Sequence, residues 1–518
     1  MAEQKQEKKK PISVREILRW ILCGLLGLLL IAAVTIRAPG KIVALLIVLL
    51  LACAALPRRA RKWFGLSTAA AVIVLAAWVF VPDGDADWRP YTFEEELAAL
   101  QAKYAVPDEE NAALIYDKLL GDMDGDPNEP EFLLQSSPSS KDEPWLSKDH
   151  PETAEWLKGH QSTIEKLLQA AEKDKCQFPI GADAVSYPKY VKRLPQIRRC
   201  TFLLLSAGNN DVAEGRTDAG LKKYLCITQI AHHLYEQQEM MCHLAGFAIE
   251  DWALTQLNRF VIESQPNGEH LELIANSIKG PENNWGSDFI KVLEYEKLLH
   301  KNTFCSLVYQ VNPQGEVRLS RDPWAGTRER WEEQLKSGKM PDPEDIAALE
   351  RMLYPTYWQR KLVKAQTISR WFYTPTLQEF AKSMDASYER YYAMTEPDFD
   401  WTREPQELLS VLTKMNLARA SFDHKYFAKL TTDMSEQSYY GVHDAYLRNL
   451  ALRRGSRLLV AIRQYQMEHN AWPADLDAIR PAVPAEALID PVTANEFAYE
   501  NQGEYFSLKA DSADIWPK

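Results

Sequence analysis

Glycine is scarce in this chain, and the short motifs of several enzyme classes are missing. Only 22 of the 518 residues are glycine, whereas glycine usually makes up roughly 7% of a protein, so few positions suit a glycine-lined phosphate loop. The sequence contains no Walker A motif, no G-x-G-x-x-G, no G-x-S-x-G and no H-E-x-x-H. No motif therefore supports nucleotide hydrolysis, dinucleotide binding, α/β-hydrolase chemistry or zincin-type proteolysis.

Cysteine is also sparse, and its spacing indicates neither a zinc site nor a redox pair. Two of the seven cysteines, Cys23 and Cys53, lie in apolar runs near the start of the chain. No C-x-x-C pair occurs among the other five, which are Cys176, Cys200, Cys226, Cys242 and Cys305. Because five is an odd number, at least one of these thiols stays free or pairs outside the chain.

Positive charge is concentrated at the N-terminus and is scarce elsewhere. Residues 1–62 hold twelve lysines and arginines against three glutamates, a local net charge of +9. The whole chain carries −12 at pH 7, so residues 63–518 carry the difference, −21. Binding to nucleic-acid phosphates needs clustered Lys and Arg. We therefore expect no nucleic-acid partner for this acidic body.

Three apolar runs open the chain, at residues 20–36, 42–56 and 66–81. A helix needs roughly 20 residues to cross about 30 Å of hydrocarbon, so the first run is long enough and the other two need their flanks. We predict three transmembrane helices within residues 17–82, which makes the chain an integral membrane protein. A cleaved signal peptide is the alternative for the first run, but two apolar runs follow it and no A-x-A site precedes Arg37.

The charges around these runs predict their orientation. Basic residues precede the first run and fill the loop after the second, whereas Asp83, Asp85 and Asp87 follow the third. The positive-inside rule then places residues 1–16, a basic tail, in the cytoplasm and the residues from 83 onward on the other side. We expect a multi-pass protein of the bacterial inner membrane with a large extracytoplasmic region. If residues 42–56 form a re-entrant or interfacial segment instead, the body faces the cytoplasm.

Residues 83–440 are expected to form a helical body. Apolar residues recur at helical spacing in segments that Pro, Gly and Asp separate. Residues 194–210 and the long segment 221–262 are expected to form a helical hairpin, with its turn at 213–220. Further helices are expected at residues 92–104, 107–120, 151–174, 342–352, 374–392 and 403–417. The pattern over residues 304–327 predicts either a short strand pair around Pro313 and Gly315 or a long loop. The predicted fold class is mainly α, with a body rich in helical hairpins.

Four residues of the long helix are the best metal-ligand candidates. His232 with Glu236, and Glu239 with His243, are spaced i,i+4 and would share a helical face. Zinc and di-iron sites use such pairs, usually with ligands from a second helix, but no E-x-x-H partner occurs. The structural interpretation makes His233 and Glu236 a surface pair and His243 a satisfied, half-buried side chain. We predict no catalytic residue and no cofactor, with zinc as the alternative at these four positions.

A second candidate is an acidic loop near residue 125. Oxygen ligands alternate there as in a calcium-binding loop, at Asp122, Asp124, Asp126 and Asn128. Pro127 stands where an EF-hand has its turn glycine, and Leu133 stands where it has a bidentate glutamate. A solvated loop at a helix end is the interpretation that fits these departures.

Residues 441–518, the C-terminal module, have a different pattern. An amphipathic helix over residues 441–469 ends at Trp472-Pro473, and a short helical turn follows at 474–479. Alternating residues on both sides of 501–503 predict a hairpin. The residues that carry the pattern are Tyr465, Asn470, Trp472, Pro473, Leu476, Asp490, Pro491, Tyr499, Gly503, Tyr505 and Ser507.

In these residues the segment from about Leu450 to the end resembles the globular part of the major pseudopilins of type II secretion systems. The resemblance implies a small α+β module in which a long helix precedes a short antiparallel sheet. Tyr440 and Gly441 precede the helix here, where a pseudopilin has its membrane helix, so polymerisation is not expected. The family's calcium loop would fall at Asp511, Ser512 and Asp514, without its glycine-rich part.

The remaining body resembles uncharacterised bacterial membrane-anchored proteins in the segments PDEENAALIY, CQFPI, LPQIRR, AEGRTDAGL and AHHL. That resemblance implies a helical extracytoplasmic body joined to the pseudopilin-like module, without an assigned activity. We expect a non-enzymatic envelope protein that binds other envelope proteins. The alternatives are a metal-assisted hydrolase of the envelope that uses His232, Glu236, Glu239 and His243, and an accessory component of a secretion apparatus.

Overall fold

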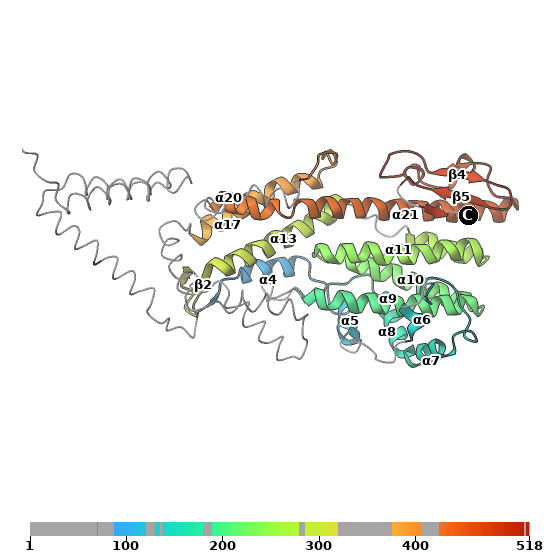
Figure 1. The fold of residues 1–518 in the computed structure, drawn as a ribbon, viewed down its shortest axis with the longest axis horizontal. Coiled ribbons are helices and arrows are strands. Elements are labelled where there is room, and N and C mark those ends of the chain that lie inside the picture. Colours follow the sequence, from blue (N-terminus) through green and yellow to red (C-terminus); the bar gives the residue numbers. More distant parts are fainter. Residues whose placement is uncertain are drawn as a thin grey trace, which may run out of the picture. The chain divides into compact units, whose positions relative to one another are not determined.

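The computed structural model is mainly helical, with two small antiparallel sheets among its described residues, which confirms the mainly α fold class (Figure 1). It describes residues 70, 88–120, 130–134, 138–179, 189–278, 285–319, 376–405, 424–511 and 514–516. The described residues fall into two compact units. The larger unit comprises Phe93–His300, Tyr388–Pro405 and Glu436–Lys518, and the smaller unit includes residues 88–92, 301–319 and 424–435.

Several predicted segments lie outside the described residues. They are the three apolar runs, apart from Ala70, the acidic loop at 122–128, the helix at 342–352 and most of the helix at 403–417. Within the described part of the chain, no helix combines the length and the apolar composition that a membrane crossing needs.

The centre of the larger unit is a layer of antiparallel helices that lie side by side in Figure 1. They are α9 (Lys189–Ala213), α10 (Thr217–Tyr235) and α11 (Met240–Glu263). The helices α5 (Ala113–Leu120), α7 (Pro151–Gly159) and α8 (Gln161–Ala171) pack against this layer. Leu203, Leu204 and Ile227 are completely buried between them, and each such side chain contributes about 1.5–3 kcal/mol by leaving water.

The predicted hairpin of α9 and α10 is confirmed, and its turn has a local explanation. Gly215 has a φ of 78°, a left-handed conformation that glycine adopts without steric cost. The Arg216 N–H donates a hydrogen bond to the Asp211 carbonyl at 2.7 Å, which closes the turn. The short connection forces α9 and α10 to run antiparallel.

The predicted continuous helix over residues 221–262 is wrong. The chain leaves the helix after Tyr235 and begins α11 only at Met240. Gln237 and Gln238 between them are fully buried, and the Gln237 amide donates to the Cys176 carbonyl at 2.7 Å while its oxygen accepts from the Phe178 N–H at 3.1 Å. Hydrogen bonds to a segment some sixty residues away therefore replace the helical bonds that this turn gives up.

The helix α21 (Glu436–His469) joins the central layer to the C-terminal sheet. It starts before Gly441, so the expected start of the C-terminal module lies inside the helix. From Asn449 onward, one side of α21 packs on α11 and α12 (Gly268–Ile278), and the opposite side carries the sheet (Figure 1). Because it is covered on opposite sides, it is buried on more than the single stripe that an amphipathic surface helix shows.

The C-terminal sheet confirms the predicted hairpin. β4 (Ala498–Asn501) pairs antiparallel with β5 (Phe506–Lys509), which pairs with β6 (Asp514–Trp516), and the short 3-10 helices η2 (Leu476–Ala482) and η3 (Ala485–Leu488) precede them. The Pro473 carbonyl accepts hydrogen bonds from the Tyr499 hydroxyl at 2.8 Å and from the Asn501 amide at 2.9 Å. The Trp-Pro segment that ends α21 is therefore fixed to the hairpin.

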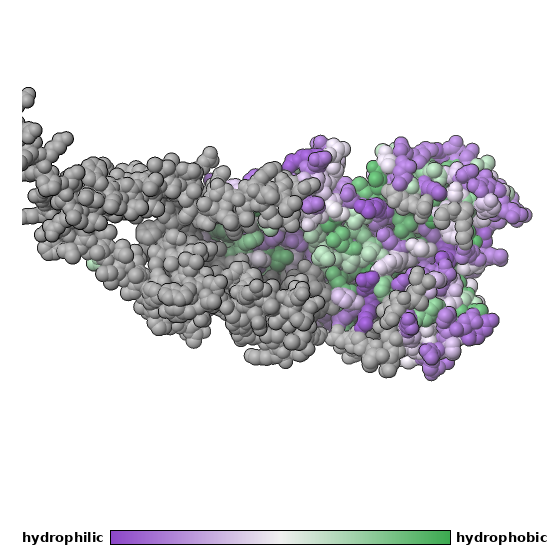
Figure 2. All heavy atoms as spheres, viewed as in Figure 1, coloured by the Kyte–Doolittle hydropathy of each residue, from purple (hydrophilic) through white to green (hydrophobic). Residues whose placement is uncertain are grey.

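The surface of the C-terminal module is mostly polar. Hydrophilic residues predominate over this end on the face that Figure 2 shows. The exposed large apolar side chains among its described residues are Met467, Val492 and Tyr505. Single exposed side chains of this kind are usual on protein surfaces.

Gly455 allows β6 to approach α21, which predicts opposite effects for two glycine substitutions in this helix. A Cβ at position 455 would lie 2.6 Å from the Ile515 side chain, whereas a Cβ at Gly441 meets nothing within 4 Å. Gly455→Ala should lower the free energy of unfolding by about 1–3 kcal/mol through overpacking. Gly441→Ala, the matched control, should raise it by about 0.5–1 kcal/mol. Urea unfolding monitored by tryptophan fluorescence measures both, and equal effects would contradict the close approach.

The smaller unit contains the second sheet, which confirms the strand pair predicted around Pro313 and Gly315. β2 (Tyr309–Val311) pairs antiparallel with β1 (Arg89–Pro90) on one side and with β3 (Val317–Leu319) on the other. Gly315 has a φ of 81°, and its N–H donates to the Asn312 carbonyl at 2.9 Å. Parts of α13 (Trp285–Val308) and α17 (Leu377–Tyr392), together with α20 (His424–Asp433), complete this unit.

Candidate functional site

The four predicted metal-ligand candidates lie around the turn between α10 and α11. His232 belongs to α10 and His243 to α11, whereas Glu236 and Glu239 lie in the turn. The two i,i+4 pairs therefore lie at the ends of two helices and not on one continuous helical face, because α10 ends at Tyr235 and α11 begins at Met240. No three His, Cys, Asp or Glu side chains are gathered as metal ligands in the described residues.

The two glutamates of the turn have separate surroundings: Glu236 is half-buried, whereas Glu239 is buried. The Glu236 carboxylate accepts a hydrogen bond from the Cys176 N–H at 2.5 Å, and Glu239 is the N-cap residue of α11. Burial raises the pKa of Glu236 to about 7, although the Cys176 hydrogen bond opposes the shift. Burial also raises the pKa of Glu239 to about 7. Both groups favour the protonated form more than an exposed glutamate does.

The histidines of this region also make structural contacts. The Nε2–H of His243 donates to the Gln237 carbonyl at 2.8 Å, which helps to hold the turn. His233, expected at the surface with Glu236, is only 1% exposed, so that prediction is wrong. Its Nε2 lies 2.8 Å from the Lys173 carbonyl and must carry the proton, so Nδ1 accepts from the Tyr116 hydroxyl at 2.9 Å. Burial lowers the pKa of His233 to about 4.

A buried ion pair next to this turn was not predicted from the sequence. Arg453 of α21 places Nη2 at 2.8 and 2.7 Å from the two carboxylate oxygens of Glu250 in α11. Both side chains are at most 2% exposed. The Tyr235 hydroxyl donates to the same carboxylate at 2.7 Å, and His232 Nε2 lies 3.7 Å from it. The side chains of Arg453, Tyr235 and His232, from α21 and α10, therefore surround the Glu250 carboxylate of α11.

The charges of this pair determine the protonation of Glu250. Burial by itself would raise its pKa, but the Arg453 charge and the neighbouring His232 lower it below its usual range. For Arg453, burial favours the neutral form, but the Glu250 charge raises the pKa above its usual value. The pair is therefore ionised at neutral pH. Next to it, burial raises the pKa of Asp251 to about 6, and the Asn449 amide donates to this carboxyl group at 2.9 Å.

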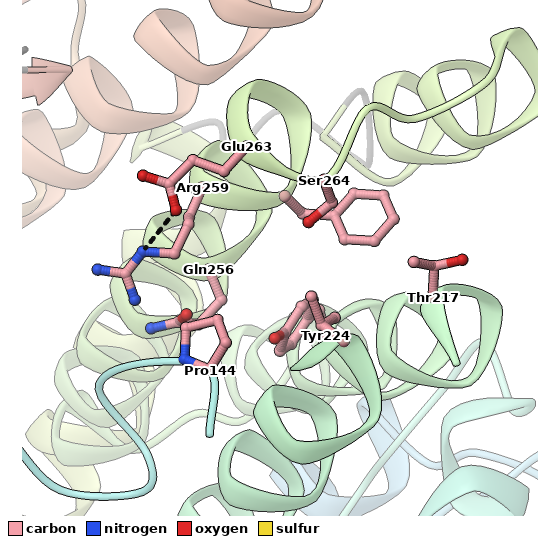
Figure 3. A pocket seen from close by; sticks show the side chains of 9 residues that line it. Pro144, Thr217, Tyr224, Gln256, Arg259, Glu263 and Ser264 are labelled. Carbon is pink, nitrogen blue, oxygen red and sulfur yellow. Dashed lines mark ion pairs between the residues drawn. The ribbon is translucent and has the colours of Figure 1, made fainter. Parts of the chain in front are cut away.

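The larger unit also contains an open pocket of about 300 Å³ between α10, α11 and the loop at Pro144 (Figure 3). Its lining residues are Pro144, Val212, Thr217, Tyr224, Gln256, Arg259, Phe260, Glu263 and Ser264. Gln256, Arg259 and Glu263 project from one side of α11, because three or four residues separate successive members. No local pattern in the sequence indicates this pocket, because its lining comes from segments up to 120 residues apart.

The chain was compared with known families, curated proteins and solved structures. No protein-family model, no curated protein and no solved structure matches this chain.

Proposed function

We propose that this chain is an integral membrane protein of the bacterial envelope that binds another envelope protein and catalyses no reaction. Three apolar runs with basic residues on their cytoplasmic flanks support the membrane anchor. The observation that carries the binding role is the 34-residue helix α21. From Asn449 onward, one side of the helix is packed on α11 and α12 and the other side holds the C-terminal sheet, so the sheet has a rigid support.

The contacts of the candidate residues agree with a structural role. Glu250 binds Arg453 and so fixes α11 to α21, whereas Glu236 and His243 bind the backbone at Cys176 and Gln237 and so hold the α10–α11 turn. The acidic body favours a partner with a basic surface, because complementary charge steers association. In this proposal the α+β module supplies the contact surface, and the helices of the larger unit support it.

A topology reporter tests the side of the membrane. A reporter that is active only outside the cytoplasm should be active after Lys518 and inactive when inserted between Arg58 and Lys62. This result follows from the positive-inside rule for three spans. The reverse pattern of activity would place the body in the cytoplasm and refute the proposed envelope role.

Site-specific cross-linking tests the partner role. A photoreactive amino acid at Tyr505, which is 54% exposed in the C-terminal module, should give one adduct of defined mass in intact cells. The same amino acid at Leu273, which is 47% exposed on α12, is the matched control and should give no such adduct. A chain that gives no adduct from Tyr505, or the same adducts from both positions, would contradict a binding role for the module.

A further inference from the structure

The loop between α11 and α12 contains the only Asn-Gly pair of the chain, Asn267-Gly268. Both residues are exposed. Gly268 is the first residue of α12, so its backbone N–H has no intrahelical acceptor. A Cβ built on Gly268 would meet no atom within 4 Å. The Gly268 nitrogen is therefore neither bound within the helix nor crowded by neighbouring side chains.

Asn267 is the N-cap residue of α12. Its Oδ1 accepts a hydrogen bond from the His270 N–H at 2.9 Å, and its carbonyl accepts one from the Leu271 N–H at 3.2 Å. Only Cβ, Cα and the carbonyl carbon separate the side-chain Cγ from the Gly268 nitrogen, so a bond between these two atoms would close a five-membered ring. Ring closure needs rotation about the Cα–C bond of Asn267, which breaks the bond to Leu271. The first turn of α12 must therefore open before the two atoms react.

Three features of this segment favour the opening of the first turn. Gln265 has a φ of 48°, a left-handed conformation that is unfavourable for a residue with a Cβ. Gly268 is exposed, and glycine is a poor helix former. The first buried side chain of α12 is that of Leu271, so the residues before it do not anchor the helix in the core. Because helix ends open locally without global unfolding, this opening is accessible to the folded chain.

We propose that Asn267 is a site of spontaneous deamidation. The Gly268 nitrogen attacks Cγ of Asn267, a new C–N bond forms, and the side-chain nitrogen leaves as ammonia with the proton of the Gly268 N–H. The product of this step is a cyclic succinimide. Water then breaks one of the two ring bonds to nitrogen: cleavage at Cγ gives aspartate, whereas cleavage at the backbone carbonyl carbon gives isoaspartate. Water is consumed and ammonia is released, so no oxidant or reductant takes part.

The two products change the start of α12 differently. Aspartate keeps an oxygen that accepts from the His270 N–H, and its negative charge is favourable at a helix N-terminus. Isoaspartate adds a methylene group to the backbone, so the geometry of the cap is lost. The Nε2 of His270 also lies 2.8 Å from Oδ1 of Asp218 in α10, and isoaspartate should weaken this contact between the two helices. The site is independent of the proposed partner-binding role, because it lies outside the C-terminal module.

Incubation of the full chain in detergent at pH 8, followed by digestion at low pH and mass spectrometry of the peptides, tests the proposal. Deamidation adds one mass unit, and an isoaspartyl methyltransferase labels the isoaspartate product. We expect both signals to increase with time at Asn267. Asn276 is the matched control, because it is exposed on the same helix but is followed by Ser277, and it should react at least tenfold more slowly. No mass gain at Asn267, or equal rates at the two positions, would overturn the proposal.

Two variants and a peptide test the mechanism. Gly268→Ala places a methyl group in open space and should slow the reaction at Asn267 at least tenfold, because the methyl group hinders the attack and alanine favours the helix. Gly159→Ala, which also has open space in α7, is the matched control and should leave the rate unchanged. A synthetic peptide of residues 264–271 lacks the folded cap and should react at least tenfold faster than the folded chain. An unchanged rate in Gly268→Ala would refute attack by this nitrogen, and equal rates in the peptide and the chain would refute control by helix opening.

Discussion

Arg453→Met should lower the free energy of unfolding by about 3–5 kcal/mol, because it leaves the Glu250 carboxylate buried without its counter-charge. The two side chains are at most 2% exposed, so water cannot replace the lost partner. Methionine preserves most of the volume and the helical propensity at this position of α21. The loss of unfolding free energy therefore measures the unpaired Glu250 charge and not a cavity. Urea unfolding of the full chain in detergent, followed by tryptophan fluorescence, measures it.

The pH dependence of this variant separates an unpaired charge from a packing defect. Without Arg453, burial should raise the folded-state pKa of Glu250 above its unfolded value. A raised carboxyl pKa favours folding below the unfolded pKa, and that contribution is lost as the pH rises through the folded pKa. The cost of Arg453→Met should therefore grow between about pH 5 and pH 8. A cost that does not change with pH would indicate a packing defect.

Two further variants complete the test. Adding Glu250→Gln to Arg453→Met removes the unpaired charge but keeps an acceptor for the Tyr235 hydroxyl, and it should restore at least about 2 kcal/mol. Lys158→Met breaks an ion pair with Glu155 whose side chains are 73% and 77% exposed, and it should cost about 0–1 kcal/mol. Equal costs for Arg453→Met and Lys158→Met would refute a stabilising role for the buried pair.

Sequence patterns predicted the elements of this fold better than the contacts between them. The α9–α10 hairpin has a glycine-containing turn, and the β4–β5 hairpin has Gly503 with a φ of 88°. Both signals act within a few residues, so a local pattern is enough to detect them. The same holds for the β2–β3 pair, whose turn uses Asn312 and Gly315. Local turn chemistry and periodicity account for these successes.

The break between α10 and α11 had no local signal. Glutamine and glutamate are good helix formers, so residues 236–239 continue a helical pattern. The break depends on Gln237 and Gln238, whose amides bind the segment at Cys176 and Gln177. A contact over sixty residues cannot be inferred from periodicity alone. The metal-ligand hypothesis depended on helical spacing across these residues, and for this reason it could not place the four side chains.

The Glu250–Arg453 pair joins residues 203 positions apart, but the sequence contains a partial signal for it. Asn449, Arg453 and Ser456 are spaced i,i+4,i+7 in α21, and all three are buried. Polar residues that recur on one side of a helix otherwise rich in leucine indicate a buried partner. The identity of that partner requires the packing of α21 on α11, which no local pattern contains.

Glu239→Gln should raise the free energy of unfolding by about 3 kcal/mol at pH 8 and have little effect at pH 5. Burial raises the folded-state pKa of Glu239 to about 7 from an ordinary value of 4.5, and each pKa unit corresponds to about 1.4 kcal/mol. Folding therefore favours the protonated carboxyl group. That stability is complete below about pH 4.5 and is lost as the pH rises through 7. Glutamine is a neutral isostere that does not titrate, so it removes the loss.

The difference in free energy of unfolding between the unaltered chain and Glu239→Gln isolates the titration of Glu239 from that of other groups. His233 and His300 have pKa values lowered to about 4 by burial, so they reduce stability as the pH falls below 6.5. Because both chains contain these histidines, their contributions cancel. Glu296 is the exception: the Glu239 charge adds to the burial that raises its pKa to about 7, so Glu239→Gln should lower the pKa of Glu296 and add slightly to the gain at pH 8.

Urea unfolding of both chains at half-unit steps from pH 5 to pH 8 measures this difference. It should rise by at most about 1.4 kcal/mol per pH unit for one titrating group. Glu155→Gln is the matched control, since its side chain is 77% exposed, and it should stay within about 0.5 kcal/mol of the unaltered chain at every pH. A stabilisation by Glu239→Gln that is the same at pH 5 and pH 8 would come from packing or helix capping. That outcome would contradict a buried carboxyl group that becomes charged near neutral pH.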